Sequence, residues 1–235
     1  YGALAEDALR DDPYLLTEPY FGADFAAVDA FALEMDVEAD DERRVEAGIL
    51  FELSYNLTNG HTFIPEKKLI PATATLLNLD SDTVERGLDR LSEQERMVRS
   101  EIAGLTACYL PEFYEAEQYI TERLARMART RIEPPRTLER TLSGVQKKNA
   151  IQYAQSQLQA IRDAASYQLL LVTGGPGTGK TTVMTGILDL FDALEIKTQL
   201  AAPTGRAAKR LSEVTGRDAT TIHRLLEAQF DPETG

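Results

Sequence analysis

The sequence predicts a mixed α/β protein with a helical front part and a rear part built on a parallel sheet. Apolar residues recur at helical spacing through most of the front part. In the rear part, a short apolar run, a glycine-rich loop and an amphipathic helix follow one another from residue 169 onward. These observations indicate helical modules followed by a strand–loop–helix unit of the kind that binds phosphate.

The composition is that of an ordinary globular protein. The chain has 235 residues, of which 43% are apolar and 27% are charged, enough for one large domain or two small ones. No run approaches the roughly 20 apolar residues of a membrane span, and no signal peptide opens the sequence, so we expect no membrane partner. The single cysteine, Cys108, excludes an internal disulfide and a cysteine-clustered metal site. We therefore expect a reduced, cytoplasmic protein.

The net charge is −13 and is unevenly distributed. Residues 168–235 carry −1, and the first 167 residues carry −12. This acidity argues against a protein that coats nucleic acid through a broad basic face. Both ends of the sequence look cut, so we interpret the chain as a piece of a longer protein.

The first forty residues predict two helices joined by a turn. Helical spacing from Ala3 to Leu9 is broken by Asp11-Asp12-Pro13 and resumes over Phe25–Met35. Between them, Gly22-Ala-Asp24-Phe25 invites a helix-hairpin-helix interpretation, in which backbone amides bind DNA phosphates. That motif normally has a second glycine where this chain has Asp24, and a carboxylate repels phosphate. We expect the hairpin fold with weak or absent DNA contact.

Residues 41–112 predict a small helical module that ends in a hairpin. One helix covers Arg43–Leu57, a second opens near Pro65, a third is capped near Ser81, and two short strands flank a turn at Gly104. This order is the outline of a winged helix. A packing module without DNA contact is an equally good interpretation.

A connecting helix over Glu112–Met127 and a linker over Arg131–Pro135 lead to the rear part. There we expect a polar helix over Gln146–Ala165 and then a strand over Leu169–Val172 that is buried on both faces. An amphipathic helix that contains Val183 and Leu194 follows the glycine-rich loop, and a second strand covers Lys197–Ala202. Strand, helix and strand within about 35 residues form a βαβ unit. The predicted domain boundaries are 1–40, 41–112, 113–150 and 151–235.

Residues 174–181, Gly-Gly-Pro-Gly-Thr-Gly-Lys-Thr, match the P-loop pattern GxxxxGKS/T between a predicted strand and a predicted helix. Glycines let the backbone approach phosphate oxygens, successive N–H groups point at them, and the helix adds its positive end. We expect Lys180 to reach the β- and γ-phosphates and the Thr181 hydroxyl to ligate Mg²⁺, and we assign both as catalytic. The ATP-binding residues predicted in the loop are Gly175, Pro176, Gly177, Thr178, Gly179, Lys180, Thr181 and Thr182.

The P-loop alone does not select a reaction. Kinases of the adenylate type also carry a Gly-Gly-Pro-Gly opening, but they usually have glycine after the lysine, where this chain has Thr181 and Thr182. They also tend to place the loop near the start of the chain. Motor ATPases of the helicase and AAA families favour Gly-Lys-Thr.

Three further segments carry a resemblance to a known family. They are residues 201–211 (AAPTGRAAKRL), residues 219–226 (ATTIHRLL) and residues 155–161 (QSQLQAI), upstream of the P-loop. This set resembles the RecD-type superfamily 1 DNA helicases, which include stand-alone RecD-like proteins, and softer matches in the front part extend the resemblance over nearly the whole chain. The resemblance implies a partial RecA-like motor domain behind helix-hairpin-helix-like and winged-helix-like modules. The chain would hold the amino-terminal region and the start of the first motor domain.

The resemblance also implies roles for individual residues. Gln157 matches the glutamine that holds the adenine base, with Gln155 and Gln159 as rivals if the register is shifted by two. Pro203, Thr204 and Arg206 match motif Ia, which contacts the single-strand backbone, and His223 would lie beside the DNA track. Without the resemblance, the glutamines would be solvent-facing, Arg206 would belong to an exposed helix face with Lys209 and Arg210, and His223 would have a structural role.

The function that the resemblance implies is that of an ATP-dependent 5′-to-3′ DNA helicase, active in DNA repair or recombination. Its partners would be ATP and single-stranded and duplex DNA, with Mg²⁺ as the cofactor. The sequence does not indicate a protein partner. No apolar strand ending in Asp-Glu follows Gly179, so we expect the Walker B pair and the arginine finger to lie outside this chain and the fragment alone to be inactive. The alternatives are a P-loop phosphotransferase and a non-enzymatic DNA-binding or adaptor module.

Overall fold

The computed structural model describes residues 5–227, and these divide into two compact units. Unit 1 extends to Ile120 and unit 2 begins at Thr121, so the boundary falls inside one long helix, α6 (Pro111–Arg129). Each unit is described by itself. The four predicted domain boundaries stay a prediction, and the predicted first helix begins at Ala3, outside the described residues.

Unit 1 opens with three short helical elements. They are α1 (Ala5–Asp11), the 3₁₀ helix η2 (Pro13–Thr17) and α2 (Phe25–Glu34). Aspartates start the last two, because the Asp12 and Asp24 carboxylates accept hydrogen bonds from the backbone N–H groups of Tyr14 and Ala27 at 3.0 and 3.1 Å. The predicted break at residues 11–13 and the predicted second helix are therefore present.

The rest of unit 1 has the element order of a winged helix. Helices α3 (Glu42–Thr58), α4 (Glu66–Leu77) and α5 (Ser81–Glu93) are interleaved with β1 (Phe63–Pro65), β2 (Val98–Ile102) and β3 (Leu105–Tyr109). The strands form an antiparallel sheet in the order β1-β3-β2, with Phe63 and Val98 both paired to Tyr109. Strand β1 was not predicted, because three residues are too few to show alternation.

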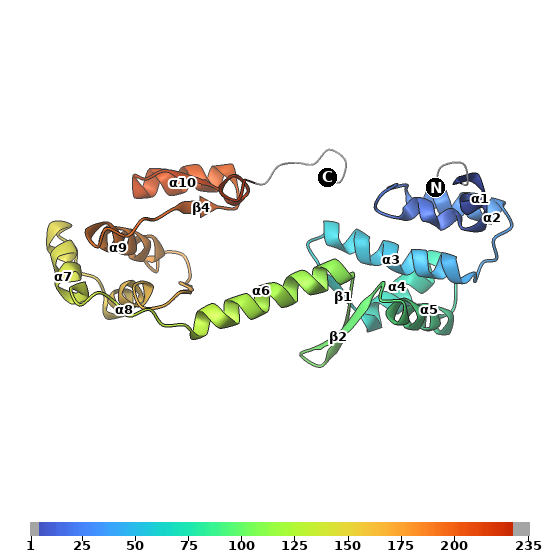
Figure 1. Cartoon of the computed structure of the whole chain (residues 1–235), viewed down its shortest axis with the longest axis horizontal. Helices are drawn as coiled ribbons and strands as arrows, with labels where there is room; N and C mark the ends of the chain where they lie inside the picture. Colours follow the sequence, from blue (N-terminus) through green and yellow to red (C-terminus); the bar gives the residue numbers. More distant parts are fainter. Residues whose placement is uncertain (1–4, 228–235) are drawn as a thin grey trace. The chain divides into compact units, whose positions relative to one another are not determined.

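The core of unit 1 forms around α3, which contacts α2, α4, α5 and β1 (Figure 1). Its fully buried side chains include Val45, Ile49, Leu69, Leu88 and Leu91. Gly87 permits the close approach of α5 to α3, because a Cβ at this position would clash with Val45.

A buried arginine ties α2, α3 and α4 together. Arg44 donates to both carboxylate oxygens of Asp29 at 2.8 and 3.0 Å and to the carbonyl oxygens of Ala39 and Leu77. It is 5% exposed, so these bonds replace the water that its charge has lost.

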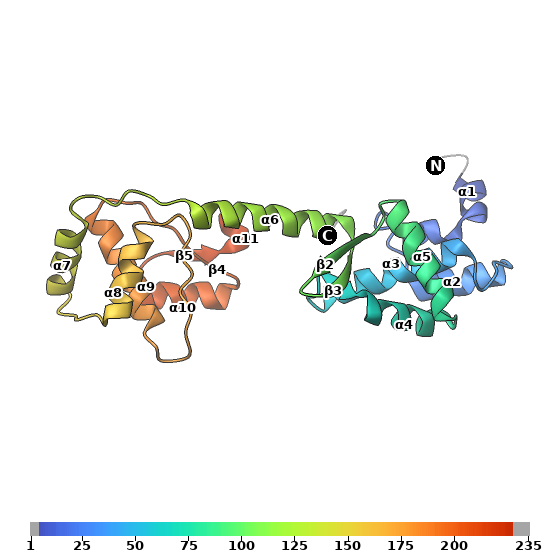
Figure 2. The ribbon, with the colours of Figure 1, turned by 90° about the horizontal axis from the view of Figure 1, so that it is seen from below.

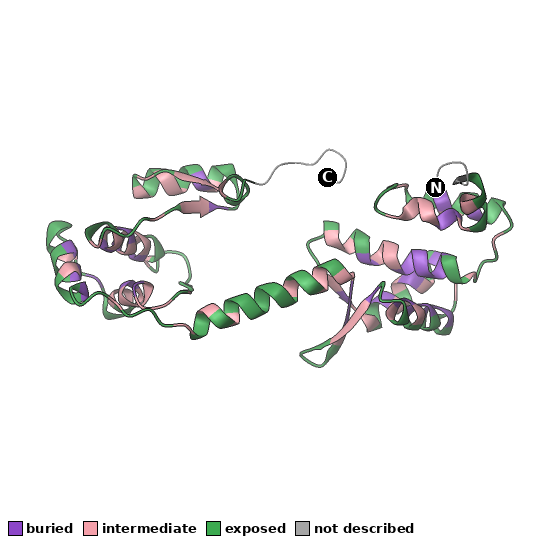
Figure 3. Ribbon diagram, in the orientation of Figure 1, coloured by how far each residue is buried: buried purple, intermediate pink, exposed green. Residues whose placement is uncertain are grey.

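Helix α6 follows the winged-helix-like module and has no buried residue along its 19 positions (Figure 3). Its first turns attach to unit 1 through Glu117, which accepts hydrogen bonds from the hydroxyls of Thr62 and Tyr109. The predicted connecting helix over residues 112–127 is present.

Unit 2 contains five helices among its described residues and a two-stranded parallel sheet (Figure 2). The helices are α7 (Leu138–Lys148), α8 (Gln155–Ala164), α9 (Lys180–Ala193), α10 (Gly205–Thr215) and α11 (Ile222–Leu225). The strands β4 (Leu200–Ala202) and β5 (Ala219–Thr221) pair in parallel, with α10 as their crossover. A βαβ unit is therefore present, but its first strand, β4, is the one predicted to be the second strand of the unit.

One local prediction in unit 2 was wrong, and two elements have other bounds than predicted. Leu169–Val172 is not a strand: a strand needs hydrogen-bonded neighbours, no described residue pairs with this run, and Leu171 is 79% exposed. The strand predicted over Lys197–Ala202 is shorter, because only the residues that pair with β5 are extended in a ladder. The polar helix over 146–165 is interrupted between α7 and α8, where Ala150 has a φ of +49°.

The core of unit 2 lies between α7, α8 and α9. It contains Leu138, Leu142, Tyr153, Ile161, Val183 and Leu190. Gly186 allows α9 to approach α8, since a Cβ there would lie 2.6 Å from Ile161 Cδ1. Among residues 5–227, we find no helix with the length and apolar character required to span a membrane.

Candidate nucleotide-binding site

The P-loop forms an exposed turn that leads directly into α9. Gly177 and Gly179 have φ values of +76° and +82°, in the left-handed region that favours glycine. The Thr178 hydroxyl donates a hydrogen bond to the Gly175 carbonyl at 2.9 Å and braces the turn from within. The glycines predicted from the motif are therefore required by the backbone at these two positions.

The Lys180 side chain bends back across the turn that precedes it. Its ammonium group donates hydrogen bonds to the carbonyl oxygens of Gly174 and Gly175, the second at 2.7 Å. Lys180 is exposed, so a ligand can reach the ammonium group from solvent. The turn thus holds a positive charge. The ammonium group can exchange its hydrogen bonds to the carbonyl oxygens for stronger, charge-assisted ones to a phosphate group.

The amino terminus of α9 is open toward the same loop. The helix begins at Lys180 and no side chain caps its first turn, so its amide N–H groups remain available to an anion. Thr181, in that first turn, is exposed. A hydroxyl oxygen is the hard type of ligand that Mg²⁺ prefers, and a single one suits an ion that takes its other ligands from phosphate and water.

Gln157 lies against the P-loop, and this distinguishes it from its two rivals. A Cβ built on Gly179 would collide with the Gln157 amide nitrogen. The Gln157 side-chain oxygen accepts a hydrogen bond from the Ala154 N–H at 3.0 Å, which fixes the amide at the start of α8. Gln155 and Gln159 are exposed, and Gln159 bonds Asp163. The structure therefore places one of the three glutamines beside the loop.

The residues predicted to contact DNA gather at the carboxyl ends of the two parallel strands. Pro203 and Thr204 follow β4, and the Thr204 hydroxyl caps α10 by accepting from the Ala207 N–H at 3.2 Å. Arg206 is exposed in the first turn of α10. His223 is exposed in α11, directly after β5, and α11 contacts β4. The parallel pairing thus brings both segments to one edge of the sheet.

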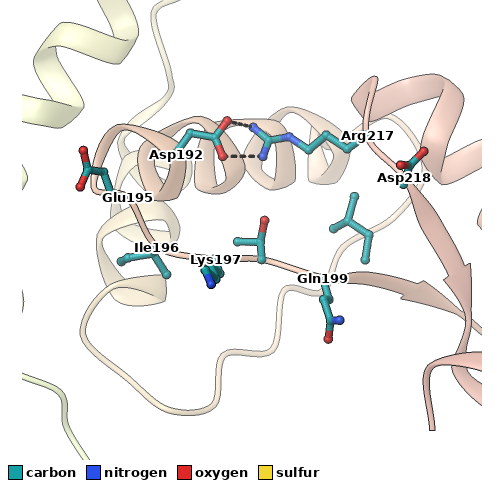
Figure 4. Close-up of a pocket in the computed structure, with 9 residues that line it drawn as sticks. Asp192, Glu195, Ile196, Lys197, Gln199, Arg217 and Asp218 are labelled. Carbon is teal, nitrogen blue, oxygen red and sulfur yellow. Dashed lines mark hydrogen bonds and ion pairs between the residues drawn. The ribbon is translucent and has the colours of Figure 1, made fainter. Parts of the chain in front are cut away.

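A cavity of about 800 Å³ in unit 2 has no P-loop residue among its lining residues (Figure 4). It is lined by the segment after α9 and by Arg217 and Asp218, before β5. Arg217 donates to both carboxylate oxygens of Asp192 at 2.6 and 2.7 Å, and this pair lowers the pKa of Asp192 and raises that of Arg217. Two cations line the cavity: Arg217 is engaged by a carboxylate, and Lys197 is exposed on the segment after α9. No glycine turn or helix start lies among its lining residues, so we assign no phosphate to this cavity.

Two residues that hold Gln157 in place, Ala154 and Tyr153, could not be found from a sequence pattern. The Ala154–Gln157 bond follows the spacing of a capping box, which is normally recognised by a serine or threonine at the first position, and Ala154 gave no such signal. Tyr153, buried against Gly186, holds α8 on α9 and therefore Gln157 near the P-loop. A lone tyrosine on a polar segment carries no pattern that would reveal this role.

The fold and this site define a P-loop nucleotide-binding domain that follows a helical module with a winged-helix-like part. Comparison with protein families gives two matches: the ATP-dependent RecD2 DNA helicase HHH domain over residues 1–63, and the AAA domain AAA_19 over residues 157–234.

Curated relatives agree with these matches. The ATP-dependent RecD2 DNA helicase of Deinococcus radiodurans is 34% identical over 96% of this chain, and the RecBCD enzyme subunit RecD of Mycolicibacterium smegmatis is 42% identical over 33% of it. The alignments cover 33% and 18% of these relatives, so the chain spans about a third of the length of the first. The chain belongs to the RecD-like helicase family. The predicted fold class, a helical front part and a partial RecA-like P-loop domain, is confirmed.

Proposed function

We propose that this chain is the part of an ATP-dependent DNA helicase that holds ATP and one edge of the DNA track. The observation that carries the proposal is the geometry around Lys180: an accessible ammonium group at the centre of a glycine turn, at the uncapped start of α9. The similarity to RecD2 and RecD proteins supports the choice of a DNA motor over other P-loop enzymes.

In this proposal the triphosphate lies in the turn formed by residues 174–179. Backbone amides of the turn and of α9 bind its oxygens, and Lys180 moves from the carbonyl groups to the β- and γ-phosphates. Thr181 supplies one ligand to Mg²⁺, which compensates the charge of the triphosphate. Gln157 presents an amide donor and acceptor beside Gly179, the pair of groups needed to hydrogen-bond an adenine edge.

Single-stranded DNA would lie along the edge formed after β4 and β5. Pro203, Thr204, Arg206 and His223 converge there, and we assign them contacts with the sugar–phosphate backbone. Arg206 supplies a cation at this edge, because it is exposed in the first turn of α10, directly after Thr204. Contacts of this kind with the backbone do not depend on base sequence.

Hydrolysis and movement require groups that we assign to other parts of the protein. A carboxylate pair must hold Mg²⁺ and orient the attacking water, and an arginine must stabilise the γ-phosphate. We infer that a second motor domain closes on the ATP site, and that opening and closing of this cleft advances the strand in the 5′-to-3′ direction. This chain alone would bind nucleotide weakly and would not unwind DNA. A cytoplasmic location stays a prediction.

The decisive experiment substitutes Lys180 in the intact protein that contains this chain. Lys180→Ala is expected to abolish ATP-dependent unwinding of a duplex with a 5′ single-stranded tail, and Lys197→Ala, an exposed lysine beyond α9, serves as the matched control. A duplex with a 3′ tail tests the direction. Unwinding by Lys180→Ala at the wild-type rate would refute the motor, and ATP turnover that single-stranded DNA does not stimulate would favour the phosphotransferase.

A further inference from the structure

A pocket of about 400 Å³ opens in unit 1 between α3 and the turn around Gly22, the predicted helix-hairpin-helix hairpin. Its floor is apolar and partly aromatic: Phe25 from α2 is buried, and Leu50 and Phe51 from α3 are half-buried. The rings of Phe25 and Phe51 stack with their centroids 4.9 Å apart and their planes 21° apart. The pocket therefore has an ordered hydrophobic base, which is the usual character of a binding pocket.

The rim of this pocket is acidic. Glu18, Asp24 and Glu112 line it, and the only cation among its lining residues is Arg96. That guanidinium is already engaged, because it forms ion pairs with Glu18 at 2.8 Å and Glu46 at 3.3 Å. The same ion pair neutralises Glu18, so the unpaired charges on the rim are those of Asp24 and Glu112. The net charge of the lining is negative, and the pocket therefore favours a cationic partner over an anionic one.

The hairpin beside the pocket cannot bind phosphate as a helix-hairpin-helix motif does. The Asp24 carboxylate accepts the Ala27 N–H at the start of α2, so one of the amides that would face a phosphate is occupied by a negative group. The winged-helix-like module carries the same sign on α5, whose exposed charged residues are one arginine and four acidic side chains: Asp82, Glu85, Arg86, Asp89 and Glu93. Residues 1–120 contain 26 acidic and nine basic residues, a net charge of −17.

An aromatic side chain stands beside the pocket. Tyr20 lies between the lining residues Pro19 and Gly22 and is 90% exposed. Its ring meets the Phe21 ring edge-on, with centroids 5.2 Å apart. Exposed tyrosines next to an apolar pocket are typical anchors of protein interfaces, because they bury a large area at little cost in conformational entropy.

We propose that this pocket docks a protein segment in which an apolar side chain is flanked by lysine or arginine. The apolar side chain enters over Phe25, Leu50 and Phe51, while the basic residues meet Asp24 and Glu112. Charge complementarity selects this occupant: an acidic rim around an apolar floor repels DNA and matches a basic, apolar peptide. In this chain the hairpin is thus a protein-docking element. The assignment is independent of the nucleotide site, which lies in unit 2.

The test measures the binding of three fluorescein-labelled hexapeptides, KKLFKK, EELFEE and KKSGKK, to the intact protein by fluorescence anisotropy. KKLFKK is expected to bind, and the other two to bind at least about tenfold more weakly. Asp24→Asn with Glu112→Gln is expected to weaken KKLFKK about tenfold while keeping the cap of α2, because asparagine caps helices as well as aspartate. The matched control, Glu34→Gln with Asp40→Asn, removes two exposed charges outside the pocket and is expected to change nothing.

Two further variants complete the design. Tyr20→Ser, at a side chain outside the core, is expected to weaken KKLFKK, and Lys180→Ala to leave its affinity unchanged even if it abolishes unwinding. The proposal is overturned if KKLFKK and KKSGKK bind equally, if the pocket pair and its control have the same effect, or if KKLFKK does not bind at millimolar concentration. It is also overturned if the Asp24/Glu112 pair lowers the affinity for a single-stranded oligonucleotide, since the pocket would then bind DNA.

Discussion

The amide group of Gln157 lies directly beside Gly179, although Gln157 belongs to α8 and Gly179 to the P-loop. Gly179 has a φ of +82°, and a Cβ on it would collide with the Gln157 side chain. Each residue therefore restricts the other: the loop has space for the amide only because position 179 is glycine. This relationship joins the proposed adenine-recognition group to the proposed phosphate cradle and yields two predictions.

The first concerns base selectivity. Gln157→Ala is expected to reduce the preference of the protein for ATP over GTP about tenfold, because it removes a bidentate amide and leaves the phosphate contacts of Lys180 in place. Competition between the two nucleotides for a fluorescent ATP analogue measures this ratio. Gln159→Ala removes an exposed glutamine that bonds Asp163 and serves as the control. A loss of selectivity in the control alone would shift the register of the assignment by two residues.

The second concerns the loop backbone. Gly179→Ala is expected to weaken nucleotide binding by at least about tenfold, because a side chain is strained at this φ and displaces Gln157. Gly144→Ala is the control, since nothing lies within 4 Å of a Cβ at this helical position. Calorimetric titration with ATP gives both affinities. Unchanged affinity in Gly179→Ala would show that the loop adopts another backbone when nucleotide binds.

Unit 1 depends on a buried ion pair. Arg44→Met is expected to destabilise unit 1 by about 3–5 kcal/mol, because it leaves the half-buried Asp29 carboxylate without its cation, with the Tyr14 hydroxyl as its remaining donor, and two carbonyl groups without the Arg44 donor. Arg43→Met, which removes the exposed pair with Asp41, is expected to cost less than about 1 kcal/mol. Urea unfolding followed by circular dichroism measures both, and equal effects would contradict the role given to burial.

Cys108 should be inert in the folded protein. Burial raises the pKa of its thiol from 9.0 to about 11, and its side chain is fully buried in β3. Iodoacetamide at pH 8 is therefore expected to alkylate it only after unfolding in urea, because the reactive species is the accessible thiolate. Rapid labelling of the native protein would show that unit 1 opens locally.

The same shift predicts how alkali affects unit 1. A pKa that is raised on folding contributes stability below the unfolded value, near 9.0, and this contribution is lost as the pH rises through about 11. Tyr109, whose pKa burial and Glu117 raise to about 12, acts in the same direction at higher pH. The free energy of unfolding should fall between pH 9 and pH 11, and Cys108→Ala should remove part of this slope.

Residue patterns on their own were enough to recognise the parts whose physical cause is local. Glycines at 177 and 179 and lysine at 180 specify a phosphate loop at the start of a helix, and the break at Asp12-Pro13 and the helix after Asp24 follow from capping and proline geometry. The resemblance of short strings around Gln157, Thr204 and His223 was sufficient to indicate the family. In these cases one segment carries the whole signal.

Tertiary structure decided what depends on a distant partner. Leu169–Val172 has the composition of a buried strand yet remains unpaired, while the less apolar Ala219–Thr221 is a strand because β4 supplies its hydrogen bonds. Only folding placed Gln157, and neither of its rivals, against Gly179, and only folding gathered Glu18, Asp24 and Glu112 around an aromatic floor. Hydrogen-bond pairing and the grouping of charges depend on positions in space, and a linear pattern does not contain them.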